Sequence, residues 1–493
     1  MKRYNIRLPV QGISFALLTV LSACAVGPDF QRPVAPAAAQ YTATDTKTAD
    51  DAATVDAPGG VQTFPKGVAP ERWWEGYGSS TLDGWVVEGL IHNRDLKSTV
   101  ATLVAAREHL AAQVGSSELP QVGFNGEYAH ERAIGIPDLG PPTDLYKVYA
   151  GVVQVNYDLD LFGGVRRANE AARAQFESQT FELEAARETL VANIVATGIR
   201  SAALKKQIEA TKRLVTLAQD EQHLTERRFE LGAASHLSVL DAQRRSHDAA
   251  ATLPPLISQW SQNHHALAVL LGRAPEAAPE DIDFDTLVLP KTIPITVPSE
   301  LVRVRPDILA AEARLHSATA QVGVATANLL PQLSLSGSFG SESFTRSGFL
   351  TGQTSVWSAV AGITQPIFQG GALLAEKRAS NAELDSALAR YESVVLRAFQ
   401  NVADSLRTLD EDARLAAERS ESEHAAHSYF DETARRHATG SLPALAEVQS
   451  EEVWQNERVG EIASRSARLT DSVALFQALG APASLKETAG VQN

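Results

Sequence analysis

Cysteine is almost absent from this sequence, since Cys24 is the only one among its 493 residues. A disulfide within the chain is therefore excluded. Long apolar runs are also missing beyond the first 23 residues. The predicted helices are rich in alanine and charged residues, and none has an apolar stretch long enough to span a bilayer. We therefore expect these helices to stand in water.

Basic residues are fewer than acidic ones. The sequence has 44 Lys and Arg and 59 Asp and Glu, which gives a formal net charge of −15. Such a chain should bind nucleic acid poorly, since phosphate contacts need clustered Lys and Arg. The sequence has no G-x-S-x-G, H-E-x-x-H, Walker loop or dinucleotide fingerprint. We therefore predict neither an enzymatic activity nor a cofactor.

Histidines do not form a recognisable metal-binding pattern. His424 and His427 are three residues apart beside Glu423, and His264 and His265 are adjacent. Neither pattern is a standard zinc signature, and no third ligand can be recognised. No metal site is predicted, and the roles of His424 and His427 are left unassigned.

The first 23 residues have the organisation of an export signal. Basic residues at positions 2, 3 and 7 precede a short apolar stretch from Val10 to Leu21. The segment Leu21-Ser22-Ala23-Cys24 resembles the lipobox of bacterial lipoproteins, which predicts lipidation of Cys24. The alternative is an ordinary signal peptide with a chance cysteine nearby. Ala25 follows the cysteine, and in lipoproteins of this kind it favours the outer membrane over the inner one.

An internal repeat organises the rest of the chain. Ala112-Gln113-Val114-Gly115 recurs as Ala320-Gln321-Val322-Gly323, an offset of 208 residues, and two further pairs of motifs keep this offset. The chain is therefore predicted to contain a duplicated unit. The predicted segments are a signal peptide (1–23), a lipid-anchored N-terminal tether (24–84), a first repeat (85–275), a linker (276–298), a second repeat (299–482) and a C-terminal tail (483–493).

Each repeat contains the same predicted elements in the same order. The pattern predicts a helix (about 86–115 and 300–328), two strands (near 121–129 and 148–158, then near 332–340 and 356–365), a long helix (about 165–230 and 371–438) and, after a tight turn, another helix (about 236–271 and 443–479). Pro254 and Pro255 predict a break or kink in the last helix of the first repeat. At 1.5 Å per residue, the long helices should measure about 100 Å.

The strands alternate apolar residues with small or polar ones, as in Val122, Phe124 and Tyr128. This pattern fits the wall of an outer-membrane barrel, although a half-buried sheet of a soluble domain alternates in the same way. Four strands cannot close a barrel, and open edges in lipid cost several kcal/mol per unpaired group. Two copies give eight strands with a filled interior, whereas three copies give twelve with a lumen.

The sequence resembles the TolC-like outer-membrane efflux proteins over nearly the whole mature chain. More closely, it resembles the NodT/OprM-like lipoproteins that serve resistance–nodulation–division (RND) pumps. The segments that carry this resemblance are Cys24–Phe30, Trp73-Trp74, Asn93–Leu96, Leu161–Gly164, Leu253–Leu256, Arg305–Ile308 and Phe368–Gly371.

The resemblance implies a mainly α fold with a small membrane β-barrel. Each duplicated unit would contribute two strands and a long helical hairpin to a homotrimer, which forms a twelve-stranded barrel and an α-helical periplasmic tunnel. It also implies anchoring by lipid in the cell outer membrane, extension into the periplasm, and docking to a periplasmic membrane-fusion adaptor and an inner-membrane RND pump.

The two hairpin turns are the first candidate sites. Gly232 and Gly440 are predicted left-handed helix stops, and Ser235 and Ser441 are predicted caps of the next helix. By the resemblance, these turns are the tips where the adaptor docks, with Gly232, Ser235, Gly440 and Leu442 as contact residues.

The second candidate site is a periplasmic gate near the end of the second long helix. By the resemblance, Asp431 lines the closed aperture, and Glu432, Arg435 and Arg436 bond to neighbouring helices. The alternative is that these are solvated surface charges. His223 occupies the position equivalent to Asp431 in the first repeat, and its role is unassigned. His427 stands where the family pattern places an apolar constriction.

The leading function is a passive, gated duct that exports small molecules across the periplasm and outer membrane. A type I protein-secretion duct and a periplasmic coiled-coil scaffold are the alternatives. Two hairpins and paired strands of about ten residues argue against the scaffold. The energy for transport must come from a partner, and neither the exported substrate nor the particular pump can be read from this chain.

Overall fold

The computed structural model describes residues 25–34, 40–41, 60–134 and 143–483. Cys24 and the signal segment lie outside these ranges. The chain divides into two compact units, which are described separately. Unit 1 comprises Met1–Pro33, Leu103–Gln179 and Ala310–Glu392, and unit 2 comprises Val34–Thr102, Thr180–Leu309 and Ser393–Asn493.

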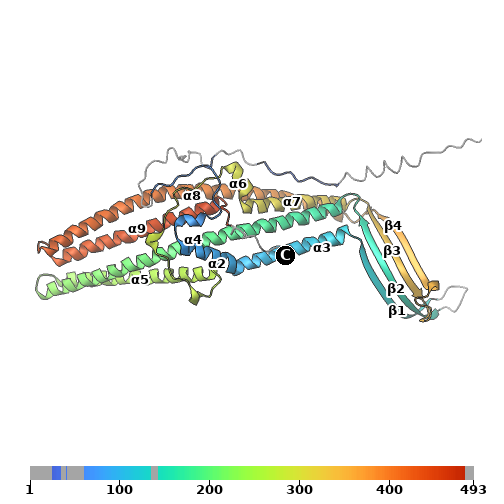
Figure 1. Cartoon of the computed structure of the whole chain (residues 1–493), viewed down its shortest axis with the longest axis horizontal. Helices are drawn as coiled ribbons and strands as arrows, with labels where there is room; N and C mark the ends of the chain where they lie inside the picture. The colour runs from blue at the N-terminus through green and yellow to red at the C-terminus, as the bar shows by residue number, and fades with distance from the viewer. Residues whose placement is uncertain (1–24, 35–39, 42–59, 135–142, 484–493) are drawn as a thin grey trace, which may run out of the picture. The chain divides into compact units, whose positions relative to one another are not determined.

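A four-stranded antiparallel sheet lies in unit 1, with its strands in chain order (Figure 1). All four predicted strands are confirmed, and the first two are longer than expected. Their bounds are β1 Gln121–Ile134, β2 Thr143–Leu159, β3 Gln332–Ser343 and β4 Ser355–Thr364.

The register of the sheet forms a row of large apolar side chains across all four strands on one face. Phe124 pairs with Val153, Val153 with Phe339, and Phe339 with Trp357. Trp357 is 75% exposed in the single chain. The adjacent row on the opposite face is Gly123, Gln154, Ser338 and Ser358, although that face also carries valines such as Val152 and Val356. The sheet therefore presents an uncovered apolar face and a more polar one, the arrangement of a wall between lipid and water.

Two helices of 67 residues run through the chain, α4 (Gly164–Glu230) and α8 (Ala372–Ala438). A tight turn follows each of them and leads to a helix of 35 residues, α5 (His236–Leu270) or α9 (Ala444–Ala478). These bounds agree with the predicted ones to within one residue at each end, and the equal lengths confirm the duplicated hairpin. None of the helices in the described ranges combines the length and apolar character needed to cross a bilayer.

The predicted helix over 86–115 is in fact two helices, α2 (Ser80–His92) and α3 (Arg94–Glu118). They meet at Asn93, whose Oδ1 accepts a hydrogen bond from the Leu96 amide (2.8 Å). The Asn93 side-chain amide also donates to the carbonyl of Leu270 (3.0 Å). Asn93 thus caps α3 while it is held by the end of α5, and this double role interrupts the helix.

The predicted helix over 300–328 is also divided, into α6 (Pro298–Val304) and α7 (Pro306–Ala327). Pro306 restricts Arg305 to an extended conformation (ψ 120°), so the first helix stops there. The predicted break at Pro254 and Pro255 is wrong, because α5 continues through both prolines.

Unit 2 encloses an aromatic cluster around the short 3-10 helix η1 (Trp73–Tyr77). The ring of Trp73 stacks on Phe476 of α9 with centroids 4.9 Å apart. The buried hydroxyl of Tyr77 hydrogen-bonds to the Ser472 hydroxyl (2.7 Å). The segment 24–84, predicted to be a lipid-anchored tether, therefore includes a packed part at Trp73–Tyr77. Two further short helices of unit 2 are η2 Pro275–Ala277 and η3 Phe284–Thr286, and η4 Gly352–Thr354 lies in unit 1.

Glu188, on α4 in unit 2, is a largely buried carboxyl group. Burial, aided by the nearby charge of Asp307, raises its pKa to about 8, although Arg305 opposes this shift. The folded chain therefore binds this proton more tightly than the unfolded chain does. The stability that Glu188 contributes is present below its unfolded pKa and is lost as pH rises from about 4.5 to about 8.

Replacing Glu188 by glutamine, which cannot ionise, should therefore stabilise the protein selectively at alkaline pH. We expect Glu188→Gln to gain about 1–3 kcal/mol over the parent at about pH 9 and little at about pH 5. Thermal unfolding followed by circular dichroism at both pH values measures the difference. Glu209→Gln, at an exposed position of the same helix, is the control. Equal gains at the two pH values would contradict this prediction.

Candidate functional site: hairpin tips and gate

The turn between α4 and α5 is closed by Gly232, whose φ of +72° is left-handed. The amide of Ala233 donates to the carbonyl of Arg228 (2.7 Å), which completes the helix end. A side-chain carbon added at Gly232 would meet no atom within 4 Å, so backbone conformation alone selects glycine here. Ser235 caps α5 as predicted, because its hydroxyl accepts a hydrogen bond from the Ser238 amide (3.1 Å).

The turn between α8 and α9 has the same backbone but different side-chain bonds. Gly440 has a φ of +76°, as predicted. The N-cap of α9 is Pro443, without any side-chain hydrogen bond, so the predicted cap by Ser441 is wrong. The Ser441 hydroxyl instead donates to the carbonyl of Arg436 (2.9 Å). The carbonyl of Leu442 lies 2.9 Å from Nδ1 of His437, so its backbone helps to close the turn.

The two tips, defined as the turns with the last helical turns on either side, present different chemistry. The first tip exposes apolar side chains: Leu231 is 73% and Leu237 77% exposed. Both tips carry charged side chains on their long helices, with Arg227 and Glu230 at the first and Glu432 and Arg435 at the second. The tips are therefore equivalent in backbone and unequal as binding surfaces.

Glu432 is the centre of an ion-pair group within α8. Its carboxylate lies 3.0 Å from Arg435 and 2.8 Å from Arg436. Hydrogen bonds from the two guanidinium groups lower the pKa of Glu432. Among the described residues of the single chain, these ion pairs are intrahelical. The predicted bonds to neighbouring helices stay a prediction. All three are well exposed, which fits surface ion pairs of small energetic value.

Asp431 is left outside this group and is 49% exposed at its side chain. The nearest basic group is Nδ1 of His427, 3.9 Å away and one turn earlier. Asp431 therefore presents a carboxylate to solvent near the second tip. Its counterpart in the first repeat, His223, is also exposed and lies 3.6 Å from Glu226.

His427 is held by an aromatic cluster that the sequence did not reveal. Its ring packs on Trp454 of α9 with centroids 4.4 Å apart, and Phe430 stacks on the same indole at 5.3 Å. The indole N–H donates to Glu423 (2.7 Å). His424 is largely exposed and lies 3.8 Å from Glu423. The sequence signal for this cluster was Trp454, the single tryptophan of α9.

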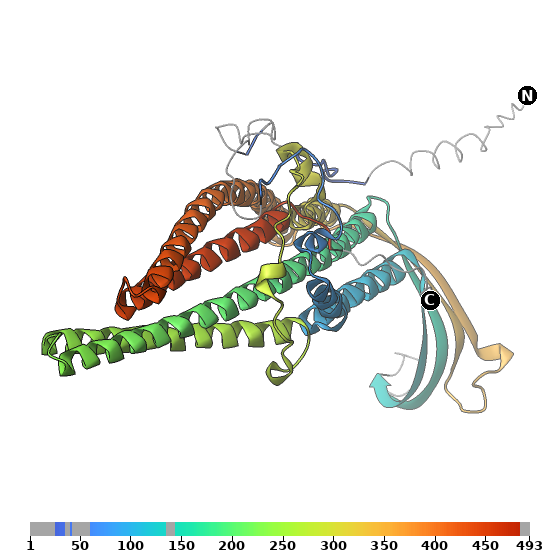
Figure 2. The same ribbon diagram turned by 60° about the vertical axis from the view of Figure 1, so that its left-hand side comes forward.

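Figure 2 shows the ribbons of the two hairpins, α4 with α5 and α8 with α9. Within unit 2, side-chain bonds between α4 and α9 form a polar seam that joins them. Arg213 on α4 makes two hydrogen bonds of 2.6 Å to Glu451 on α9. The buried Glu221 on α4 accepts from Gln449 on α9 (2.7 Å) and pairs with Arg245 on α5 (2.8 Å). The Arg213–Glu451 pair has the bidentate geometry that makes a surface ion pair effective.

Metal ligands do not gather in this region. In the part of the chain that the structure describes, no group of three or more His, Cys, Asp or Glu side chains is arranged to hold a metal ion.

Known proteins resemble this chain over most of its length. The family model described as "Outer membrane efflux protein" matches residues 85–273 and 297–481. Outer membrane protein OprJ of Pseudomonas aeruginosa is 31% identical over 412 residues, which cover 82% of each chain. The probable efflux pump outer membrane protein TtgC of Pseudomonas putida is 28% identical over 472 residues, or 94% of this chain and 93% of TtgC.

Among solved structures, the outer-membrane channel OprN superposes with a TM-score of 0.81 at 27% identity. The match covers 93% of this chain and 99% of OprN, so it includes the sheet and both hairpins. The two segments of the family model also correspond to the two repeats found in the sequence. The chain therefore belongs to the outer membrane efflux protein family.

Proposed function

We propose that this protein is the outer-membrane channel of a tripartite efflux pump, a passive and gated duct for small molecules. The observation that carries the proposal is the sheet, whose exposed apolar face runs in register across all four strands. Such a face suits lipid, while its polar reverse suits a water-filled lumen. The similarity to OprJ, an outer membrane protein, and to TtgC, a probable efflux pump outer membrane protein, supports the same function.

The working form is a homotrimer. In the described sheet, β1 and β4 are the edge strands. Their outer N–H and C=O groups cannot stay unpaired in lipid. Three copies of four strands close a barrel of twelve, and the helices of the three chains continue it as a periplasmic tunnel. The protein thus resides in the cell outer membrane, held by the barrel and by lipid on Cys24.

The partners are a periplasmic membrane-fusion adaptor and an inner-membrane RND pump, which supplies the energy. The adaptor docks at the tips, where Gly232 and Gly440 set the turns and Ser235 and Leu442 lie beside them. The exposed Leu231 and Leu237 at the first tip offer apolar contact. The charged residues near the second tip, on α8, form the gate.

The gate is formed around Asp431. In a trimer, three carboxylates near the axis attract cations, impede anions and occupy the narrowest part of the passage with their side chains. Glu432 and Arg435, already paired along α8, stiffen the same turns. His427 and its aromatic cluster fix the position of α8 relative to α9 beside the gate.

Removing the carboxylate ring should open the closed channel. We expect Asp431→Ala to raise single-channel conductance in planar bilayers several-fold, and to raise antibiotic leakage into cells that lack the partner pump. His223→Ala, at the equivalent position of the first repeat, is the matched control and should leave both unchanged. An unaltered conductance in Asp431→Ala would remove this residue from the gate.

Lipid at Cys24 should assist assembly without being essential to the channel. When Cys24→Ala is exported by a non-lipoprotein signal, we expect less trimer in the outer membrane but an intact conductance per trimer, because twelve strands hold the protein in the bilayer. Heat-modifiable migration on gels and bilayer recording measure the two quantities. A complete loss of membrane insertion would show that the barrel proposal is wrong.

A further inference from the structure

The residues that follow Cys24 are packed onto unit 1 instead of hanging free. We call Ala25–Arg32 the strap. The amide of Val26 donates to the carbonyl of Phe162 in the turn between β2 and α4 (2.9 Å). The ring of Phe30 stacks on His316 of α7 with centroids 4.4 Å apart. Arg32 ends the strap with a 2.6 Å bond to Glu312. The strap is thus held at both ends and in its middle.

Two glycine contacts bring the strap closer to the body than side chains would allow. A Cβ on Gly27, whose φ is +94°, would lie 2.4 Å from Cα of Gly323 in α7. A Cβ on Gly323 would lie 2.7 Å from the Arg167 side chain and 3.0 Å from the Val26 carbonyl oxygen. A freely moving tether requires no such fit between two backbones.

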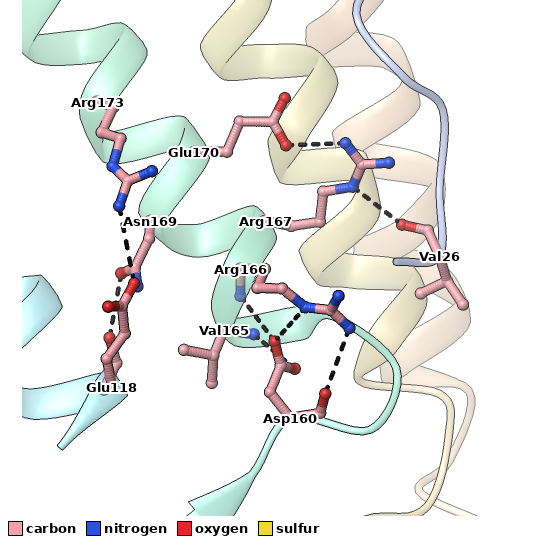
Figure 3. A network of polar contacts seen from close by, with 10 residues as sticks. Val26, Glu118, Asp160, Val165, Arg166, Arg167, Asn169, Glu170 and Arg173 are labelled. Atoms are coloured by element: carbon pink, nitrogen blue, oxygen red, sulfur yellow. Dashed lines mark hydrogen bonds and ion pairs between the residues drawn. The ribbon is translucent and has the colours of Figure 1, made fainter. Parts of the chain in front are cut away.

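A buried guanidinium group fastens the centre of the strap. The side chain of Arg167 is only 6% exposed. It bonds to the carbonyl of Val26 (3.3 Å), to the Asp29 carboxylate (2.5 Å) and to Glu170 (2.8 Å), and Figure 3 shows its bonds to Val26 and Glu170. Partial burial would raise the pKa of Glu170, but its bonds to Arg167 and His316 outweigh that effect and lower it. The strap therefore supplies acceptors that a buried cation needs.

We call the residues that hold the strap its seat, namely Arg167, Glu170, Glu312, His316 and Gly323. The seat occurs only once, although the chain is duplicated. At the offset of 208 residues, Gly323 corresponds to Gly115, where an added Cβ would meet nothing within 4 Å. The other seat residues have chemically different counterparts: Ala375 for Arg167, Arg378 for Glu170, Val104 for Glu312 and Glu108 for His316. The seat joins α4 of the first repeat to α7 of the second. It is therefore a specialised surface of unit 1, fitted to this one segment.

We propose that the strap fixes the lipid anchor beside the helix-side end of β2, so that anchor and sheet enter the membrane as one positioned unit. This inference rests on the proposed lipidation and on the barrel in the outer membrane. Cys24 precedes Ala25 by one residue, about 3.8 Å between Cα atoms. Ala25 in turn lies against Gly163, where a Cβ would come within 2.6 Å of its Cα. Ala25, the described residue next to Cys24, therefore lies at the junction between the sheet and α4, and the proposal rests on this contact.

The first experiment loosens the strap without touching Cys24 or the strap itself. Gly323→Ala raises the helix propensity of α7, yet its Cβ collides with Arg167 and Val26. In detergent-solubilised full-length protein, we expect hydrogen exchange in the strap to accelerate roughly tenfold or more. Gly115→Ala makes the same chemical change in α3 and should leave the exchange as in the parent. Arg167→Gln should also accelerate it, by removing the bonds to Val26 and Asp29.

The second experiment locates the anchor. A diazirine-bearing fatty acid, supplied to growing cells and attached at Cys24, is activated by light and its crosslinks are mapped by mass spectrometry. We expect crosslinks within the chain to concentrate on 157–163 in the parent and in Gly115→Ala, and to scatter in Gly323→Ala. Crosslinks that are scattered in the parent, or a strap that exchanges as fast as an unfolded peptide, would overturn the proposal.

Neither readout depends on transport, so the failures can be told apart. A protected strap in a protein that does not conduct refutes the proposed channel and leaves the docked strap. A conducting trimer whose strap exchanges freely refutes the strap and leaves the channel. If Cys24 takes up no fatty acid while the strap is protected, the anchoring role is lost.

Discussion

The hydrogen-bonding demand of the two edge strands governs the rest of the molecule. In lipid, a backbone N–H or C=O without a partner costs several kcal/mol, and no water is present to supply one. The described sheet has four strands and two open edges. An outer-membrane protein with this sheet must pair β1 and β4 with other strands. The trimer is the proposed answer, and it makes the barrel a property of the assembly rather than of one chain.

The two long helices, α4 and α8, have 67 residues each and reach about 100 Å. Helices of that length in water cannot rely on local propensity alone. They are held by neighbours, through apolar faces and through polar bonds such as Arg213–Glu451 and Glu221–Gln449. Within unit 2, these bonds tie the first hairpin to the second.

Much of this fold could be predicted from the sequence, because its signals are local and repeated. Alternation over ten residues marks the strands, and glycine stops such as Gly232 and Gly440 mark the helix ends. The features that escaped prediction depend on distant partners. Asn93 divides a helix because the end of α5 holds its side chain. Ser441 fails as a cap because its hydroxyl donates to the carbonyl of Arg436.

The gate remains a prediction, and the contacts of its residues depend on distant partners in the same way. Asp431, Glu432 and Arg435 could be placed on one stretch of helix by sequence position. Their partners could not, and the structure pairs Glu432 with its own helix. The contact between His427 and Trp454 joins residues on two helices, so no spacing rule announces it. Asp431 is exposed and Glu432 pairs within its own helix. The proposed gate therefore acts only in the assembled trimer.

Equivalent positions in the two repeats can have different roles. Gly115 and Gly323 occupy the same place in the repeated Ala-Gln-Val-Gly motif, so the motif alone does not distinguish them. One faces open space, and the other lies under the strap, where its missing side chain allows two backbones to touch. The distinction arises only because Arg167 and Glu170 belong to one repeat while Gly323, Glu312 and His316 belong to the other. A repeated motif therefore identifies equivalent positions, and the contacts around each copy determine which of them has acquired a separate function.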